Sequence, residues 1–296
     1  MGLWNDIKGS FNRGSSLTKL IYINLGVFIA ISFAAIAGFL FTNPLIDENT
    51  VRFLAVPASL PGLAMRPWTL ITYMFLHKDI WHILFNMLWL YWFGTIFLQM
   101  LDQRKLVSVY LTGGICGAAL YILSFNIFPA FAGIVSESVA IGASASVMAV
   151  VVAIAAYTPD YPINLLLLGR VKIKYMALAI LVLTSFMDFQ VNSGGKLAHI
   201  GGAIFGYVYA MKLRQGSDLG KWTNAVIDWC ATLLKPRKKM KVTYRRPPAN
   251  DHEYNKVKAD RQAEINAILD KISKGGYDSL TREEKDILFR ESQSRH

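Results

Sequence analysis

The stretch Ile141-Gly142-Ala143-Ser144-Ala145-Ser146-Val147-Met148 places a serine among the smallest side chains, at the head of an apolar run that ends near Tyr157. Small residues in a membrane helix form a packing surface more often than a reactive site. The meaning of Ser144 therefore depends on whether this run lies in a membrane, and on which other polar groups share its depth.

The composition of the chain answers the first question. Of its 296 residues, 53% are hydrophobic and 17% are charged, whereas soluble globular domains average about 25% charged residues. We therefore expect an integral membrane protein. Cys116 lies in an apolar run and Cys230 in a segment expected to be cytoplasmic, so we expect neither a structural disulfide nor a metal cluster.

Six apolar segments predict an all-α fold, a polytopic bundle of six transmembrane helices. They cover residues 19–41, 81–100, 106–128, 144–157, 175–189 and 197–213. Six spans put both termini on one side of the membrane, where Lys and Arg are concentrated, while residues 129–141 on the other side contain neither. The positive-inside rule therefore predicts cytoplasmic termini. The 42–68 connection on the opposite side is apolar enough to be partly inserted.

Three regions follow from these spans: a cytoplasmic lead over residues 1–18, a membrane domain over residues 19–213 and a cytoplasmic tail over residues 214–296. In the tail, residues 219–234 are amphipathic and suit the membrane surface. The basic residues 235–239 suit anionic lipid headgroups.

The rest of the tail predicts two soluble helices, over residues 251–273 and 282–291. Thr281 and Glu284 have the spacing of a capping box for the second helix. This part of the tail is a candidate for self-association or for binding a partner. We do not expect nucleic acid as a partner, because the topology already accounts for the basic charge.

The polar groups of three segments lie at a similar depth. Ser144 and Asn86 are each sixteen residues from the cytoplasmic boundary of their segment, and His199 is thirteen residues from its own. These counts correspond to about 24 Å and about 20 Å along a helix. Since the hydrocarbon core is about 30 Å thick, all three groups lie below the outer surface. The segment that begins at Ser144 is too short to cross fully, so it must start at the floor of a cavity open to the outer side.

These residues have the types that acyl transfer needs. A serine hydroxyl becomes a nucleophile when a base takes its proton, and histidine is the usual base; we assign these roles to Ser144 and His199. His82 and Asn86 share one helix face and, with the Ser144 N–H group, are candidate donors to an oxyanion. Gly142 permits a tight entry into the helix. This chemistry requires no cofactor and no metal.

Each of these residues alone has a simpler explanation. A lone membrane histidine is often structural or part of a proton path, and Gly202 and Gly206 form a packing motif that brings the sixth segment against the fourth. Ser146 is a rival nucleophile, but two residues along a helix it faces away from Ser144. His77 is expected to be exposed in a turn. The coincidence of four polar groups at one depth favours a catalytic site.

Motifs in the second, fourth and sixth segments resemble those of the rhomboid intramembrane serine proteases: His82-x-x-x-Asn86, Gly142-x-Ser144 and Ala198-His199-x-x-Gly202-x-x-x-Gly206. The resemblance covers about residues 66–213. It implies a Ser–His dyad that cleaves transmembrane protein substrates in or beside a membrane helix, without a cofactor, in a bacterial inner membrane. Carried over, Ser144 is the nucleophile, His199 the general base, and His82 and Asn86 line the oxyanion hole.

The chain departs from the family pattern at three positions. Ala145 stands where glycine is common, and we expect its methyl group to narrow the oxyanion hole. Met148 replaces an aromatic residue that stacks on the histidine, and its thioether can still pack against the ring. Trp68 is followed by Thr69 rather than by arginine. No catalytic group is lost, so these differences bear on rate and substrate preference.

Two other functions fit a membrane bundle. An inactive scaffold of the same fold would bind membrane helices without cutting them, but dead relatives usually lose the serine or the histidine, and this chain keeps both. A transporter or proton path would need charged residues deep in the spans. Asp188, near one end of the fifth segment, is the one candidate, and we expect it to order the 190–196 loop instead.

Overall fold

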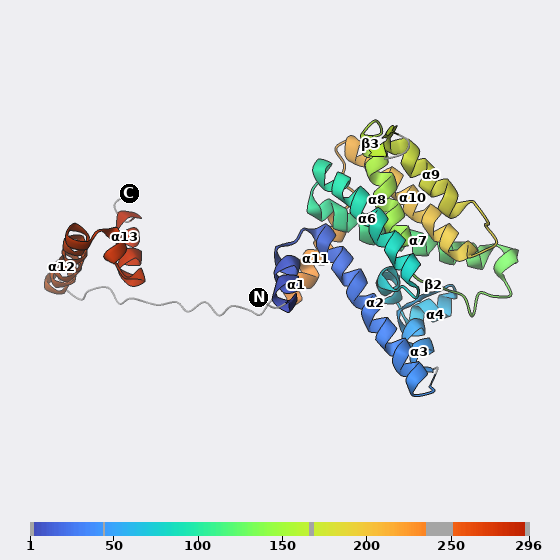
Figure 1. The fold of residues 1–296 in the computed structure, drawn as a ribbon, viewed down its shortest axis with the longest axis horizontal. Coiled ribbons are helices and arrows are strands. Elements are labelled where there is room, and N and C mark those ends of the chain that lie inside the picture. The colour runs from blue at the N-terminus through green and yellow to red at the C-terminus, as the bar shows by residue number, and fades with distance from the viewer. Residues whose placement is uncertain (1–2, 44, 166–168, 235–250, 294–296) are drawn as a thin grey trace. The chain divides into compact units, whose positions relative to one another are not determined.

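The computed structural model describes residues 3–43, 45–165, 169–234 and 251–293. The chain forms two compact units, Met1–Lys235 and Pro236–His296 (Figure 1). The described helices of the first unit are α1 (Leu3–Arg13), α2 (Ser16–Leu40), α3 (Leu45–Leu54), α4 (Leu60–Met65), α5 (Thr69–Thr72), η1 (Tyr73–Phe75), α6 (Ile80–Met100), α7 (Gln103–Ile127), η2 (Pro129–Phe131), α8 (Ser144–Tyr157), α9 (Ile173–Ser185), α10 (Ser193–Arg214) and α11 (Lys221–Leu234). Its described strands are β1 (Val56–Pro57), β2 (Val139–Ala140), β3 (Pro162–Leu165) and β4 (Gly169–Lys172).

Helices α2, α6, α7, α8, α9 and α10 coincide with the six predicted spans, so the all-α polytopic membrane bundle is confirmed. Among the described helices, α2, α6 and α7 are long and apolar enough to cross a membrane, and α8 and α9 are shorter apolar helices. Carboxylates define where two of these helices begin, because Asp79 and Asp102 each accept a backbone N–H at the start of α6 and α7.

The boundaries of α9 and α10 differ from the prediction. Helix α9 ends at Ser185 rather than at residue 189, and α10 begins at Ser193 rather than at residue 197. The earlier start comes from Asn192, which has a φ of +58° and caps α10 by accepting the Gly195 N–H group. The sequence predicts this turn as part of the 190–196 connection, and its glycines, Gly194 and Gly195, disfavour a helix in isolation.

Helix α8 lies at the centre of the bundle and is nearly all buried. A Cβ atom built on Gly202 or Gly206 of α10 would lie 2.1 Å from the carbonyl oxygen of Ala145 and 2.3 Å from that of Ala149. Only glycine therefore permits this approach, in which the backbone of α10 touches that of α8. This contact fixes the position of the start of α8 along α10.

The 42–68 connection folds onto the end of the bundle at which α8 begins. It contains α3 and α4, and its strand β1 pairs with β2 in antiparallel register, Val56 opposite Ala140. Val56 and Ala58 are fully buried. The connection therefore packs against the bundle instead of forming a solvated linker. At the other end of α8, β3 and β4 form an antiparallel hairpin. These strands are too short to leave a period in the sequence.

Helix α11 belongs to the first unit, whereas the sequence placed the boundary of the tail before it, at residue 214. Polar contacts explain the difference. The Thr112 and Thr223 hydroxyls lie 2.8 Å apart, the Ser108 hydroxyl donates to the Gly220 carbonyl, and α11 forms a further ion pair with the start of α7. A basic, amphipathic sequence does not reveal such contacts in advance.

The second unit is a helical hairpin, α12 (Asp251–Gly275) and α13 (Arg282–Gln293), with the short η3 (Tyr277–Ser279) between them. Both helices were predicted within a few residues. The capping box is confirmed, because the Thr281 N–H donates to the Glu284 carboxylate and the Glu284 N–H donates to the Thr281 hydroxyl. The predicted basic segment 235–239 lies outside the described residues.

Candidate active site

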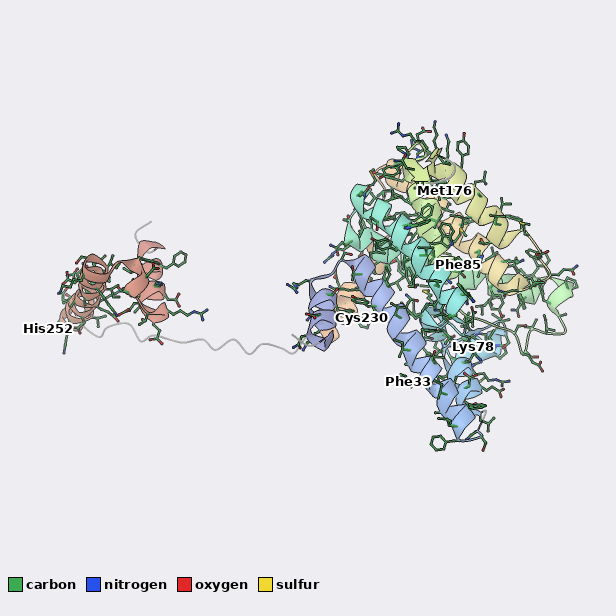
Figure 2. The ribbon with its side chains drawn as sticks, viewed as in Figure 1. Phe33, Lys78, Phe85, Met176, Cys230 and His252 are labelled. Carbon is green, nitrogen blue, oxygen red and sulfur yellow. The ribbon has the colours of Figure 1, made fainter. Side chains whose placement is uncertain are left out.

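A cavity of about 440 Å³ opens at the end of the bundle where α8 begins. Side chains from α6, α8, α9 and α10 and the residues just before these helices line it: Asp79, Trp81, His82, Phe85, Asn86, Trp89, Ile141, Ser144, Val147, Met148, Val151, Ile180, Thr184, Asn192, Gly195 and His199. Phe85, one of these lining residues, is labelled on α6 in Figure 2. The cavity therefore brings together the four polar residues that the sequence singled out.

Ser144 is the first residue of α8 and is half-buried. The chain enters the helix through Gly142, whose φ of +111° is one that residues with a side chain rarely adopt. The first N–H groups of a helix have no partner inside it. The Ser144 hydroxyl and the start of α8 are thus presented to the same cavity.

His199 reaches the cavity from the first half of α10. Its Nδ1 atom lies 3.2 Å from the carbonyl oxygen of Thr184 on α9. A carbonyl can only accept, so this contact requires the proton on Nδ1 and leaves the lone pair on Nε2. A histidine in this tautomer can accept a proton at Nε2, as a general base must.

His82 and Asn86 line the cavity from one face of α6. Asp79 holds the start of this helix by accepting the His82 N–H at 2.7 Å. The His82 ring lies against the backbone of Gly142, where an added Cβ would be 2.7 Å from Nε2. The Asn86 amide donates one hydrogen bond to the His82 carbonyl at 2.8 Å, which leaves its second N–H group for another acceptor.

A comparison with protein families matches residues 64–216 to the rhomboid domain. The chain belongs to the rhomboid family. Over 87 residues it is 34% identical to the rhomboid protease GlpG of Klebsiella pneumoniae, a match that covers 29% of this chain and 31% of that protein. It is 42% identical over 55 residues to the mitochondrial RHOMBOID-like protein 12 of Arabidopsis thaliana, which covers 19% of this chain and 16% of that one.

The matched segment thus spans less than a third of the length of these curated relatives. Residues 250–294, which contain the tail hairpin, match a separate family of unknown function, DUF6576. The rhomboid match covers the cavity and every residue assigned to it, whereas the tail hairpin lies outside it.

In this rhomboid, the burial of His77 differs from the prediction. The sequence predicts an exposed ring, but the ring is fully buried. Its Nε2 atom accepts the Ala143 N–H at 3.3 Å, and its ring lies edge-on to that of His82, 4.9 Å away. His77 therefore supports the backbone next to Ser144. In the sequence, the only sign of this role is that His77 stands five residues before His82.

The methyl group of Ala145, which the sequence predicts to narrow an oxyanion hole, points away from the cavity of this rhomboid. Ala145 is buried against α7, where Gly117 makes room: a Cβ on Gly117 would lie 2.5 Å from that of Ala145. Ala145 is absent from the cavity lining, whereas Met148 is part of it, together with His199. The two residues differ because their side chains leave α8 in different directions: that of Ala145 points to α7, and that of Met148 points to the cavity.

Ser146, the rival nucleophile, faces α7 rather than the cavity. It is fully buried, and its hydroxyl lies where a Cβ on Gly114 would come within 2.4 Å. Within the described part of the chain, no group of three His, Cys, Asp or Glu side chains is placed to hold a metal ion. Both cysteines are free.

Proposed function

We propose that this protein is an intramembrane serine protease in which Ser144 is the nucleophile and His199 the general base. One observation carries the proposal: a single cavity is lined by Ser144, His199, His82 and Asn86, from three different helices. If each of these four residues had only a packing role of its own, they would not need to line the same cavity.

In the proposed reaction, His199 Nε2 takes the proton of the Ser144 hydroxyl while Oγ attacks the carbonyl carbon of the scissile peptide bond. The tetrahedral intermediate collapses when His199 returns this proton to the leaving amine, and an acyl-enzyme remains on Ser144. Water then attacks the ester carbonyl while His199 takes its proton, and the second tetrahedral intermediate breaks its bond to Oγ as His199 returns the proton to Ser144, which releases the new carboxyl group and restores the enzyme. The 3.2 Å contact with the Thr184 carbonyl supports the starting tautomer.

The oxyanion would be stabilised by His82, Asn86 and the N–H group of Ser144. Donors preorganised for such a charge contribute about 3–4 kcal/mol each to the transition state. His82 suits the role of an oxyanion donor because its ring lies against Gly142. Asn86 suits it because only one of its two amide hydrogens bonds to the His82 carbonyl.

The substrate class we propose is the transmembrane segment of another membrane protein, in or near which the bond is cut. The apolar part of the lining supports this assignment: Trp81, Phe85, Trp89, Val147, Val151 and Ile180. We also propose that both termini are cytoplasmic in a bacterial inner membrane, so that water enters the cavity from the outer side. The distribution of Lys and Arg supports this orientation.

The test uses the purified full-length protein with a fluorophosphonate probe and with a single-span membrane protein as substrate. We expect labelling and cleavage, and a loss of at least about 1,000-fold in cleavage for Ser144→Ala. Ser146→Ala is the matched control and should retain both, because that hydroxyl faces α7. Labelling that survives Ser144→Ala would contradict the assignment of the nucleophile. Binding of the substrate without cleavage would favour the inactive scaffold.

A further inference from the structure

The end of α9 leaves a carbonyl group free beside the general base. The last carbonyls of a helix have no partner within it. In α9 the Phe186 N–H bonds back to Val182, so the chain leaves the helix before any later N–H reaches Thr184 in the helical pattern. The Thr184 oxygen instead lies 3.2 Å from Nδ1 of His199. Had α9 continued to residue 189, this oxygen would have been used inside the helix.

Lys196 holds the same end of α9 from α10. It lies three residues before His199, so both side chains emerge on the same face of α10. Its ammonium group donates to the carbonyl oxygen of Met187 and, at 2.5 Å, to that of Asp188. A cation at the C-terminal end of a helix is also favoured by the helix dipole. Two side chains of α10 thus bind three carbonyls at or just beyond the end of α9.

The turn that joins α9 to α10 needs the support that these contacts of Lys196 provide. Asp188 and Asn192 have φ angles of +47° and +58°, although neither is glycine. Backbone in this region persists only where the surrounding contacts hold it. The sequence suggested that the side chain of Asp188 orders this loop; in the structure it is the carbonyl of Asp188, bound by Lys196 and by the Val191 N–H.

We propose that Lys196 is a positioning residue for the catalytic base. By holding the end of α9, Lys196 keeps the Thr184 carbonyl within reach of His199 Nδ1, which selects the tautomer whose Nε2 can take the proton of Ser144. The inference rests on the proposed protease function. In serine proteases with a triad, a carboxylate orients the histidine in this way; here a backbone carbonyl accepts the same hydrogen bond, and Lys196 fixes its place.

The experiment compares Lys196→Met with Lys196→Arg, which keeps a cationic donor. The control is Lys78→Met (Lys78 is labelled in Figure 2), because Lys78 forms its ion pair with Asp47 and not with α9 or α10. Cleavage of a single-span substrate gives kcat and KM, and nitrogen NMR of histidine-labelled protein reports the tautomer of His199. Wild type and Ser144→Ala are measured first.

We expect Lys196→Met to lower kcat about 10-fold to 100-fold, by analogy with the loss of a group that orients a metal-bound histidine, with KM nearly unchanged. The NMR spectrum should change from one tautomer with the proton on Nδ1 to a mixture. Lys196→Arg should restore most of kcat, and Lys78→Met should behave as wild type. Thermal unfolding identifies a variant that merely loses stability.

An unchanged kcat in Lys196→Met, or a lowered kcat with an unchanged His199 tautomer, would overturn the inference while leaving the protease function intact. A wild-type protein that neither labels nor cleaves would overturn the proposed function itself. If Lys196→Met fails to fold, Lys196→Arg supplies the test: a shift toward a mixed tautomer with a matching fall in kcat at wild-type stability would support the inference, and a lowered kcat with an unchanged His199 tautomer would overturn it.

Discussion

The contact between α8 and α10 and the contact between α12 and α13 join helices in two different ways. In the first, backbones touch: the carbonyl oxygen of Ala145 lies where a Cβ on Gly202 would be, 2.1 Å away. In the second, aliphatic side chains such as Ile268 and Leu280 are buried between the helices, and an ion pair between Lys271 and Glu284 lies beside them at 2.9 Å.

The difference follows from the solvent of each unit. Lipid tails are as apolar as leucine, so helices in a membrane gain little from burying large side chains and associate by close packing of small ones. In water the burial of apolar area is the main driving force. The α8–α10 contact should therefore be sensitive to added volume, and the α12–α13 contact to removed volume.

The largest effect is expected from Gly202→Ala. The new methyl group would overlap the Ala145 carbonyl, a backbone atom that cannot move aside, so we expect the membrane unit to lose roughly 3 kcal/mol or more of its free energy of unfolding. Thermal unfolding in detergent measures it. Gly26→Ala on α2 is the matched control, because nothing lies within 4 Å of its added Cβ.

Equal stability of Gly202→Ala and Gly26→Ala would contradict the backbone contact between α8 and α10. Gly26→Ala itself should be neutral or slightly stabilising, since alanine favours a helix over glycine. The comparison thus separates the packing effect from the helix propensity.

A smaller effect, limited to the tail, is expected from Ile268→Ala. Ile268 is 4% exposed, whereas its neighbour Leu269 is 49% exposed. Removing the buried side chain should cost the hairpin about 2–4 kcal/mol, and Leu269→Ala should cost far less. Hydrogen exchange of the full-length protein should show lost protection in residues 251–293 and none in the bundle. Loss of protection in both units would contradict their independence.

The smallest effect is expected from acid acting on the capping box. Hydrogen bonds from Lys271 and then from the Thr281 N–H lower the pKa of Glu284 below its ordinary value of 4.5. A lowered folded-state pKa means that the stabilisation is present above the unfolded-state pKa and is lost as the pH falls through the folded-state value.

Hydrogen exchange of wild type and Glu284→Gln, compared at each pH, isolates this contribution. We expect wild-type α13 to be better protected at neutral pH and the two proteins to converge in acid. The bundle should show no difference between them, since Glu284 lies in the second unit. A constant difference at every pH would contradict a role for the ionised carboxylate.

Much of the candidate site was predictable from sequence, because its residues lie on regular helices. The helix period relates His82 to Asn86, and the count of residues along each span relates their depth to that of Ser144 and His199. The burial of His77 was not predictable, because its ring packs beside His82 and accepts the N–H of Ala143, which is 66 residues away in the sequence. The tautomer-selecting carbonyl of Thr184 was also hidden, since it depends on where α9 ends.

The sequence by itself determined the number and type of the helices, the membrane as their solvent, and the polar groups at one depth. These follow from hydrophobic length and helical rise, which are local properties of the chain. Only the tertiary structure decided that Ala145 faces Gly117 instead of the cavity, that β1 pairs with β2, and that Lys196 and His199 bind the end of α9. Such contacts join residues far apart in sequence or depend on the end of a helix, and no local period encodes them.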